Sequence, residues 1–270
     1  MGCRMSRFIS KPPPHRLESS FGLDASAGRI PGTSVVHKFG RAVVGTTFTP
    51  VAFGGFYNVL QPASATTLRV KAGNANDTAA GTGAREITLI GLDETGAEVT
   101  ETLATAGASA SSATSATFIR LYRLYVSVSG TYATQSAGSH AADIVIENGA
   151  GGTDWATIDS TDFPKGQSEI GVFSVPLGKT AYIEAFNIQV DSNKPADVIL
   201  FQRPDILQAA APYSGMRILV QSIGLTGSFG ITSTAPLGPL PALTDVGFMA
   251  KVGVGTGILT VDFEIYLEDT

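Results

Sequence analysis

Short segments in which apolar and polar residues alternate make up most of the chain from about residue 43 onward. The clearest runs from Ile258 to Leu267, where every second residue is Leu, Val, Phe or Ile and the residues between are mostly polar. Residues 86–92 and 98–103 flank Asp93-Glu94-Thr95-Gly96, a pattern typical of a β-hairpin with Gly at a positive φ. A period of two predicts strands with one buried and one solvent-exposed face.

No segment of helical length has apolar residues at i, i+3, i+4 and i+7, so the pattern disfavours crossover helices and parallel sheets. Many short strands separated by turns favour antiparallel sandwiches. The alternation breaks around residues 162–166. We therefore predict an all-β chain with an extended N-terminal arm (residues 1–41) followed by two antiparallel β-sandwich domains. These are residues 42–165 and a jelly-roll-like domain of residues 166–270.

The first 41 residues differ from the rest in charge. They hold seven of the 18 basic residues but only two of the 23 acidic ones, so they carry +5 while the remaining residues carry −10. The prolines of residues 10–32 remove backbone donors and favour an extended conformation. We predict that this arm docks on an adjacent subunit, and the alternative is a disordered tail. The side chains predicted to make the contact are Arg4, Arg7, Phe8, Lys11, Arg16, Leu17, Phe21, Arg29, Lys38 and Arg41.

Composition indicates a protein whose surface is covered by partners. Charged residues make up only 15% of the chain, against about 25% in ordinary soluble domains. Burial in an oligomer or larger assembly explains this deficit. Cys3 is the only cysteine, which excludes a disulfide framework and leaves the redox compartment open. The chain has no apolar run of the ~18 residues that a membrane span needs, so we expect no membrane contact.

Candidate catalytic and metal-binding residues are few. The histidines His15, His37 and His140 are far apart in the sequence, whereas zinc needs three or four convergent ligands, so we expect no metal and no cofactor. Only His140 lies in the body as a candidate base for a hydrolase. Two carboxylate pairs could form a glycosidase dyad: Asp159 with Asp162, and Glu98 with Glu101. Solvated strand faces and turns explain these carboxylates more simply, and we expect no catalytic residues.

Aromatic residues occur near Gly54-Gly55, and aromatic and basic residues occur together in one predicted strand around residues 120–125. They form a candidate ligand or interface surface, suited to a glycan or a protein, made of Tyr57, Arg120, Tyr122, Arg123 and Tyr125. The alternative is that they are core and rim residues of a sheet. Nucleic acid is not expected as a partner of the body, because a net charge of −10 repels phosphate.

Residues 36–41 (VHKFGR), 76–93 (NDTAAGTGAREITLIGLD) and 175–183 (VPLGKTAYI) resemble segments of β-rich virion structural proteins of tailed bacteriophages. These are strand and turn phrases without catalytic motifs. The resemblance implies a non-enzymatic component of the particle, present in many copies on the head, at the neck or on the tail. It supplies no catalytic residues for this sequence.

Together these observations predict a structural protein located in the virion, of the decoration or fibre-attachment kind. Its expected partners are other virion structural proteins and copies of itself. Two alternatives stay open. One is a host-glycan-binding module of the tail or adsorption apparatus, with the tyrosine-bearing strand as its platform. The other is a hydrolase such as a depolymerase, with His140 or a carboxylate pair in its site.

Overall fold

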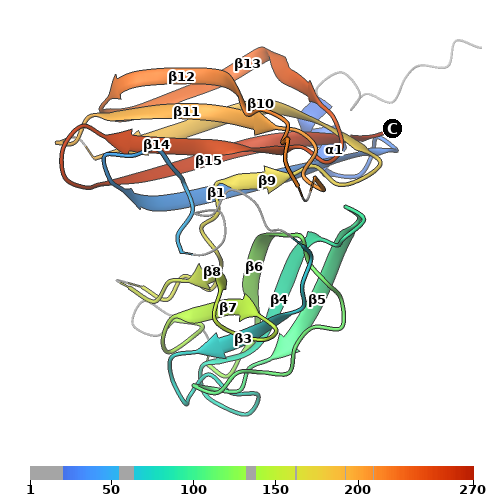
Figure 1. The fold of residues 1–270 in the computed structure, drawn as a ribbon, viewed down its shortest axis with the longest axis vertical. Coiled ribbons are helices and arrows are strands. Elements are labelled where there is room, and N and C mark those ends of the chain that lie inside the picture. Colours follow the sequence, from blue (N-terminus) through green and yellow to red (C-terminus); the bar gives the residue numbers. More distant parts are fainter. Residues whose placement is uncertain (1–20, 55–63, 132–137, 162, 192, 209) are drawn as a thin grey trace, which may run out of the picture.

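The computed structural model describes residues 21–54, 64–131, 138–161, 163–191, 193–208 and 210–270. Within these ranges a short helix, α1 (Phe21–Ser26), precedes fifteen strands. All paired strands are antiparallel, and they form four sheets (Figure 1). The all-β prediction is therefore confirmed.

The two larger sheets form what we call the major unit. The first sheet has the order β1-β15-β10-β13, with the bounds Thr33–Val44, Gly257–Asp269, Lys179–Val190 and Gly227–Leu240. The second has the order β12-β11-β14-β2, with the bounds Arg217–Leu225, Ala196–Arg203, Asp245–Val252 and Thr49–Pro50. A further short strand, β9 (Val172–Ser174), also pairs with β14.

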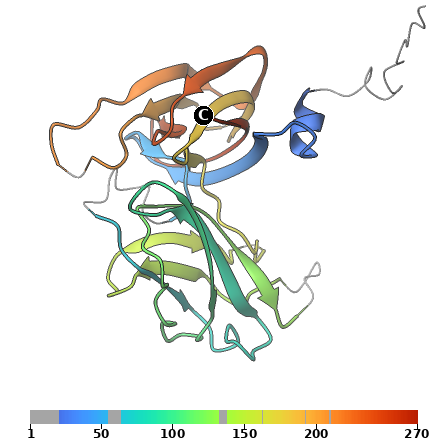
Figure 2. The same cartoon turned by 90° about the vertical axis from the view of Figure 1, so that its right-hand side faces the viewer.

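The two smaller sheets form what we call the inserted unit. One has the order β3-β7-β8, with the bounds Leu68–Ala72, Ile144–Asn148 and Asp154–Ile158. The other has the order β5-β4-β6, with the bounds Glu98–Ala104, Ala84–Leu92 and Arg120–Ser129. Here β4 and β5 form the predicted hairpin, and Gly96 in its turn has a φ of 84°. Figures 1 and 2 show this unit on one side of the major unit.

A first hydrophobic core is shared by the two sheets of the major unit. The alternate residues of β15 predicted to be buried all lie in it. The ring centroid of Phe248 (β14) lies 5.3 Å from that of Phe263 (β15) and 5.5 Å from that of Phe186 (β10), so side chains of both sheets meet there. Full burial of each such side chain contributes about 1.5–3 kcal/mol. This core holds the sheets together.

A second core joins the inserted unit to the outside of the second sheet. Val198 and Leu200 of β11 belong to the first core, whereas Ile199 and Phe201 belong to the second, together with Met249 of β14. Because successive side chains of a strand point to opposite faces, β11 is buried on both sides. The second sheet is therefore the middle layer of the molecule.

The chain enters and leaves the inserted unit at the same strand. β2 pairs with β14 at Met249 and Ala250, and β9 pairs with it at residues 245–247. The major unit thus contains both the residues before the inserted unit and the residues after it. We predicted two consecutive domains that meet at residue 165, and the observed order is different: strands β1 and β2 belong with the C-terminal strands.

The predicted arm also differs from the structure over its described part. Residues 21–26 are helical, and β1 pairs with β15 from Thr33 to Val44, so the boundary predicted at residue 41 lies inside a strand. The alternation of β1 is hidden because its buried positions include Lys38 and Gly40. A Cβ on Gly40 would lie 2.3 Å from the backbone nitrogen of Gly171, so the close approach of the two backbones requires glycine here.

Strand β13 was not predicted, because its sequence contains Pro236, Pro239 and three glycines. Proline lacks the N–H that a central strand needs, so it is confined to edges and bulges. The structure agrees with this rule. β13 lies at the edge of the first sheet, and its pairing with β10 shifts register near Ile183.

Candidate functional site

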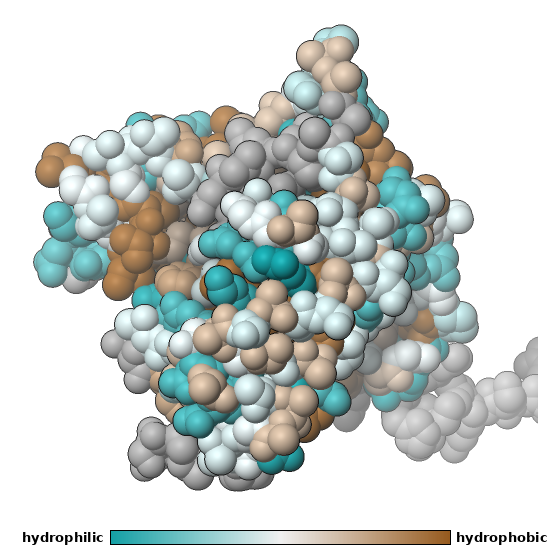
Figure 3. Space-filling view, turned by 60° about the horizontal axis from the view of Figure 1, so that its bottom comes forward, coloured by the Kyte–Doolittle hydropathy of each residue, from teal (hydrophilic) through white to brown (hydrophobic). Residues whose placement is uncertain are grey.

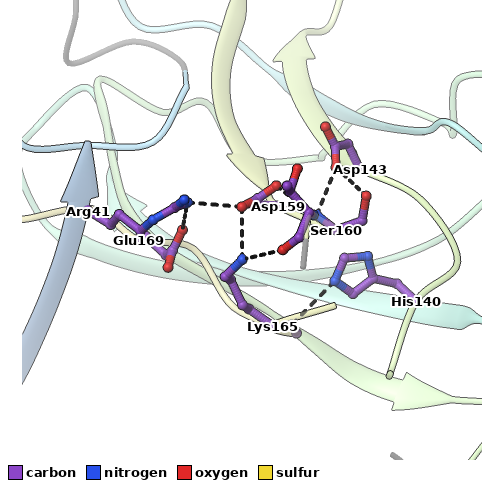
Figure 4. A network of polar contacts seen from close by, with 9 residues as sticks. Arg41, His140, Asp143, Asp159, Ser160, Lys165 and Glu169 are labelled. Carbon is purple, nitrogen blue, oxygen red and sulfur yellow. Dashed lines mark hydrogen bonds and ion pairs between the residues drawn. The ribbon is translucent and has the colours of Figure 1, made fainter. Parts of the chain in front are cut away.

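A network of charged side chains joins β1 of the major unit to the segment that leads from β8 of the inserted unit back to β9 (Figure 4). Arg41 on β1 donates from Nη1 to Asp159 Oδ2 at 3.0 Å and to Glu169 Oε2 at 3.4 Å. Lys165 Nζ donates to the same Asp159 oxygen at 2.9 Å. Asp159 directly follows β8 and Glu169 precedes β9, so the network ties both ends of this returning segment to β1.

The pKa values of the two carboxylates of this network are shifted in opposite directions. Burial alone would raise the pKa of Asp159, but hydrogen bonds from Lys165 and Thr161 and the charge of Lys165 hold it below its ordinary value. For Glu169, burial is the strongest influence and raises the pKa, although Arg41 and Lys165 oppose it. Asp159 is therefore the firmly ionised centre of the network.

A second polar cluster lies deeper, between β6 of the inserted unit and the second sheet. Arg120 donates from Nε to Asp245 Oδ1 at 3.0 Å and from Nη2 to Oδ2 at 2.8 Å. Ser174 (2.6 Å) and Arg203 (3.2 Å) donate to the same carboxylate. Burial would raise the pKa of Asp245, but the charge and hydrogen bonds of Arg120 outweigh it and lower the pKa. Arg120 is only 1% exposed, so this ion pair is almost wholly shielded from solvent.

Lys38 makes a third link across the same junction. Its Nζ donates to the backbone carbonyl of Tyr122 on β6. Burial, aided by the nearby charge of Arg123, lowers the pKa of Lys38 to about 7. The sequence predicted Lys38 and Arg41 to dock on another subunit. In the structure they contact the inserted unit and its connections in the same chain instead, because β1 is a strand of the major unit.

His140 is held as part of the fold. It is 3% exposed, and its Nδ1 lies 2.7 Å from the carbonyl oxygen of Ala142. The backbone N–H of Gly166 donates to its Nε2 at 3.3 Å, so both ring nitrogens are engaged within the chain. Next to it, Asp143 accepts hydrogen bonds from the backbone N–H and hydroxyl of Ser160 (Figure 4). This arrangement does not present His140 as a base to a substrate.

The carboxylates considered for a dyad are similarly occupied. Glu98 accepts a hydrogen bond from the Tyr122 hydroxyl, and Glu101 accepts two from the backbone N–H groups of Ser115 (2.7 Å) and Ala116 (2.9 Å). Asp159 belongs to the junction network, and Asp162 lies outside the described residues. Within the described ranges, no group of three His, Cys, Asp or Glu side chains converges as metal ligands do.

The predicted aromatic surface is not a single surface. Arg120 and Tyr122 are buried, and the Tyr122 ring lies 4.9 Å from that of Phe173. Arg123 is exposed and lies 5.8 Å from the centroid of the Tyr125 ring, on the solvent side of β6. Tyr57 lies outside the described residues. β6 therefore has a buried face, which includes Tyr122, and an exposed face, which includes Arg123.

Of the remaining residues of the predicted docking set, the structure describes only Phe21 and Arg29. Arg29 forms an exposed ion pair with Asp24, with Nε and Oδ1 2.6 Å apart. Phe21 begins α1. The others lie outside the described residues: Arg4, Arg7, Phe8, Lys11, Arg16 and Leu17.

Sequence reasoning did not single out a group of carboxylates on the outer face of the first sheet. A hollow of about 860 Å³ beside α1 is lined by Glu184, Asp262 and Glu264, among others. A second hollow, of about 560 Å³, shares Glu184 and Tyr266 with the first and adds Glu268 and Asp269. The alternation of β15 placed Asp262 and Glu264 on its polar face, so this signal was available. Their concentration depends on the pairing with β10, which the sequence does not show.

Hydrophobic side chains are exposed along β12, an edge strand of the second sheet. Ile218 is 54% exposed and Ile223 76% exposed. Figure 3 views the molecule with the inserted unit brought forward, and there pale and hydrophilic residues predominate, with hydrophobic ones in separate areas. No helix within the described ranges has the length and apolarity needed to cross a bilayer.

Comparisons with known proteins do not show a family. No protein-family model matches the chain, and no curated protein matches it. Among solved structures, the chain aligns with the crystal structure of the infectious bursal disease virus VP2 subviral particle at 10% identity and a TM-score of 0.21, covering 88% of this chain and 76% of that one. A structure of the Gx strain of the same virus aligns at 10% identity and a TM-score of 0.18, covering 89% and 77%. TM-scores of this size do not show a shared fold.

Proposed function

We propose that this chain is a non-enzymatic structural subunit of a virus particle. The finer proposal is a decoration or fibre-attachment protein of a tailed phage, present in multiple copies and attached through its N-terminal segment. Its partners are then copies of itself and the head, neck or tail proteins on which it assembles.

The observation that carries the proposal is the order of strands in the major unit. Leaving out the inserted unit (β3 to β8), the chain alternates between the two larger sheets. The first sheet takes β1, β10, β13 and β15, and the second takes β2 and β9, then β11 and β12, and then β14. The orders β1-β15-β10-β13 and β12-β11-β14-β2 match those of an eight-stranded jelly roll, and this match supports the proposal. The inserted unit packs on the outside of the second sheet. Jelly rolls build viral capsids and also occur in lectins and cupins, and the division of charge between residues 1–20 and the rest of the chain favours the capsid role among these.

The distribution of charge and apolar surface favours assembly. Residues 1–20 hold four basic and one acidic residue, so they carry +3 while residues 21–270 carry −8. Subunits divided in this way attract one another through the segment of one and the body of the next. The exposed isoleucines of β12 add an apolar edge of the kind that interfaces cover.

The test is whether the full chain is part of a particle. Gradient-purified particles from the native source should contain the chain at many copies, counted by quantitative mass spectrometry and located by electron microscopy. A variant lacking residues 1–20 should keep the circular dichroism of the full chain but be lost from the particles. The deletion must end before Thr33, because a longer one removes part of β1. A chain absent from purified particles would refute the proposal.

The glycan-binding alternative has weaker support, because Arg120 and Tyr122 of its proposed platform are buried. A glycan array probed with the full chain separates the two functions. Specific glycan binding that survives deletion of residues 1–20, combined with absence from particles, would favour the alternative.

A further inference from the structure

The two hollows on the outer face of the first sheet form one acidic groove. They adjoin at Glu184 and Tyr266, on the neighbouring strands β10 and β15. Five carboxylates line them: Glu184, Asp262, Glu264, Glu268 and Asp269. Their described lining residues include no lysine, arginine or histidine. The groove is therefore a surface of concentrated negative charge with an aromatic residue at its centre.

The contacts within the groove leave much of this charge facing solvent. Asp262 accepts a single long hydrogen bond from Asn187, at 3.3 Å, and Glu264 is exposed opposite His37 on β1. Burial raises the pKa of Tyr266 well above its ordinary value, and the hydrogen bond between its hydroxyl and Glu184 raises it further. Asp269 is paired with Lys179, at the far end of β10. A cationic partner would gain by binding here.

We propose that this groove binds the basic segment of residues 1–20 from a neighbouring copy of the chain. The multi-copy arrangement rests on the proposed function, whereas the match between segment and groove rests on the charge of the segment in the sequence and on the carboxylates that line the groove. A metal ion is a poorer occupant, because the described carboxylates do not converge as metal ligands do. An extended basic segment fits a groove that holds its carboxylates in a row along β15, at residues 262, 264 and 268.

Charge, length and position all support this occupant. The segment carries +3 against the −8 of residues 21–270. Fully extended, 20 residues span about 66–72 Å, which is longer than any strand of the first sheet, so the segment can reach a neighbour. The described chain begins at α1, and Gly22 and Leu23 of this helix line the groove. The segment therefore starts beside one groove, and two copies brought together can exchange segments in the manner of a domain swap.

Cross-linking of the full chain tests the contact directly. Lys11 is the only lysine of the segment, and a carbodiimide joins its amine to a carboxylate only when the two groups touch. In an equal mixture of ¹⁴N- and ¹⁵N-labelled chains, we expect cross-links from Lys11 to Glu184, Asp262 or Glu264. About half of them should join chains of different label.

A matched pair of double variants controls for charge alone. Asp262→Asn with Glu264→Gln removes two of the three carboxylates to which Lys11 can be joined, so the comparison is made on the Lys11–Glu184 cross-link, which every variant can still form. Its yield should fall about fivefold, as expected for losing two solvent-facing charge pairs. Glu86→Gln with Asp154→Asn removes two exposed carboxylates of the inserted unit and should leave the yield unchanged.

The outcomes separate this inference from the proposed function. Cross-links confined to single chains would overturn exchange between copies, and the absence of Lys11 cross-links to the groove would overturn the groove as receptor. Either result could accompany a chain that is still present in particles, in which case the proposed function survives. Cross-links between chains in a protein absent from particles would support the groove and refute the virion role.

Discussion

Replacing Arg120 with methionine should destabilise the chain strongly, because it leaves the buried carboxylate of Asp245 without its main partner. Arg120 makes two of the closest contacts of that carboxylate, at 2.8 and 3.0 Å, and its side chain is 1% exposed. Removing one member of a buried ion pair costs about 3–5 kcal/mol. Ser174 and Arg203 still donate to Asp245, so we expect a loss at the lower end, about 3 kcal/mol.

Urea unfolding at neutral pH measures this loss with two probes. Trp155 is the only tryptophan and lies buried in the second core, so its fluorescence reports on the inserted unit, while circular dichroism reports on all strands. Arg29→Met is the control. Arg29 donates to Asp24 at 2.6 Å, but its side chain is 54% exposed and that of Asp24 27% exposed, and exposed pairs contribute at most about 1 kcal/mol. Equal losses in the two variants would refute the reasoning.

The pH dependence gives a second check on Arg120→Met. In the native chain the pKa of Asp245 is lowered, so its contribution is present above its ordinary pKa and is lost as pH falls through the lower folded value. Without Arg120, burial becomes the dominant influence and raises the pKa, so the folded variant gains a proton more readily than the unfolded chain. The loss of unfolding free energy in the variant, relative to the native chain, should therefore be smaller at about pH 5 than at neutral pH. A deficit that grows on acidification would contradict this account.

Three further substitutions probe the junction. Lys38 has a pKa of about 7 in the folded chain against 10.5 when unfolded, so between these pH values only the unfolded chain holds the proton, and the free energy of unfolding rises with pH. Lys38→Met should remove up to about 1.4 kcal/mol per pH unit of this slope, as measured by urea unfolding midpoints. An unchanged slope would refute the burial of this amine. Gly40→Ala should cost at least about 1–3 kcal/mol in the same assay, because its Cβ would meet the Gly171 backbone at 2.3 Å, and a neutral effect would show that the approach is looser. Asp159→Asn should lower the free energy of unfolding by about 1–3 kcal/mol at neutral pH. Because the pKa of Asp159 is lowered in the folded chain, this loss of stability should fade as the pH falls below the ordinary pKa of an aspartate. A loss that stays constant with pH would show that the charge of Asp159 is not responsible.

Local patterns predicted the parts of the fold whose side chains obey a simple rule. β15 and the hairpin of β4 and β5 alternate cleanly, and Gly96 marks the turn. β1 was not predicted as one strand, because a lysine and a glycine occupy two of its buried positions. These residues are required there by contacts with Tyr122 and Gly171, which lie far away in the sequence. The insertion could not be predicted, because the pairing of β1 with β15 joins opposite ends of the chain.

The candidate site was predicted less well, for a related reason. A charged residue on a strand is exposed by default, so Arg120 indicated a binding surface. Its burial depends on Asp245, 125 residues later, and on Ser174 between them. The acidic groove, by contrast, could have been found in part from β15 alone, since Asp262 and Glu264 alternate with its buried residues. Only the pairing with β10 adds Glu184 and makes a groove of a polar strand face.

The return of the chain to β14 has a consequence for how such a protein can diversify. Because β2 and β9 are held by one strand, the segment between them can be lengthened, shortened or replaced without changing the strand order of the two larger sheets. A lineage can thus acquire a new module in place of the inserted unit by a single genetic exchange while it keeps the major unit. Each new module then has to supply partners for Arg41 and Asp245, the two major-unit residues that now bind Asp159 and Arg120.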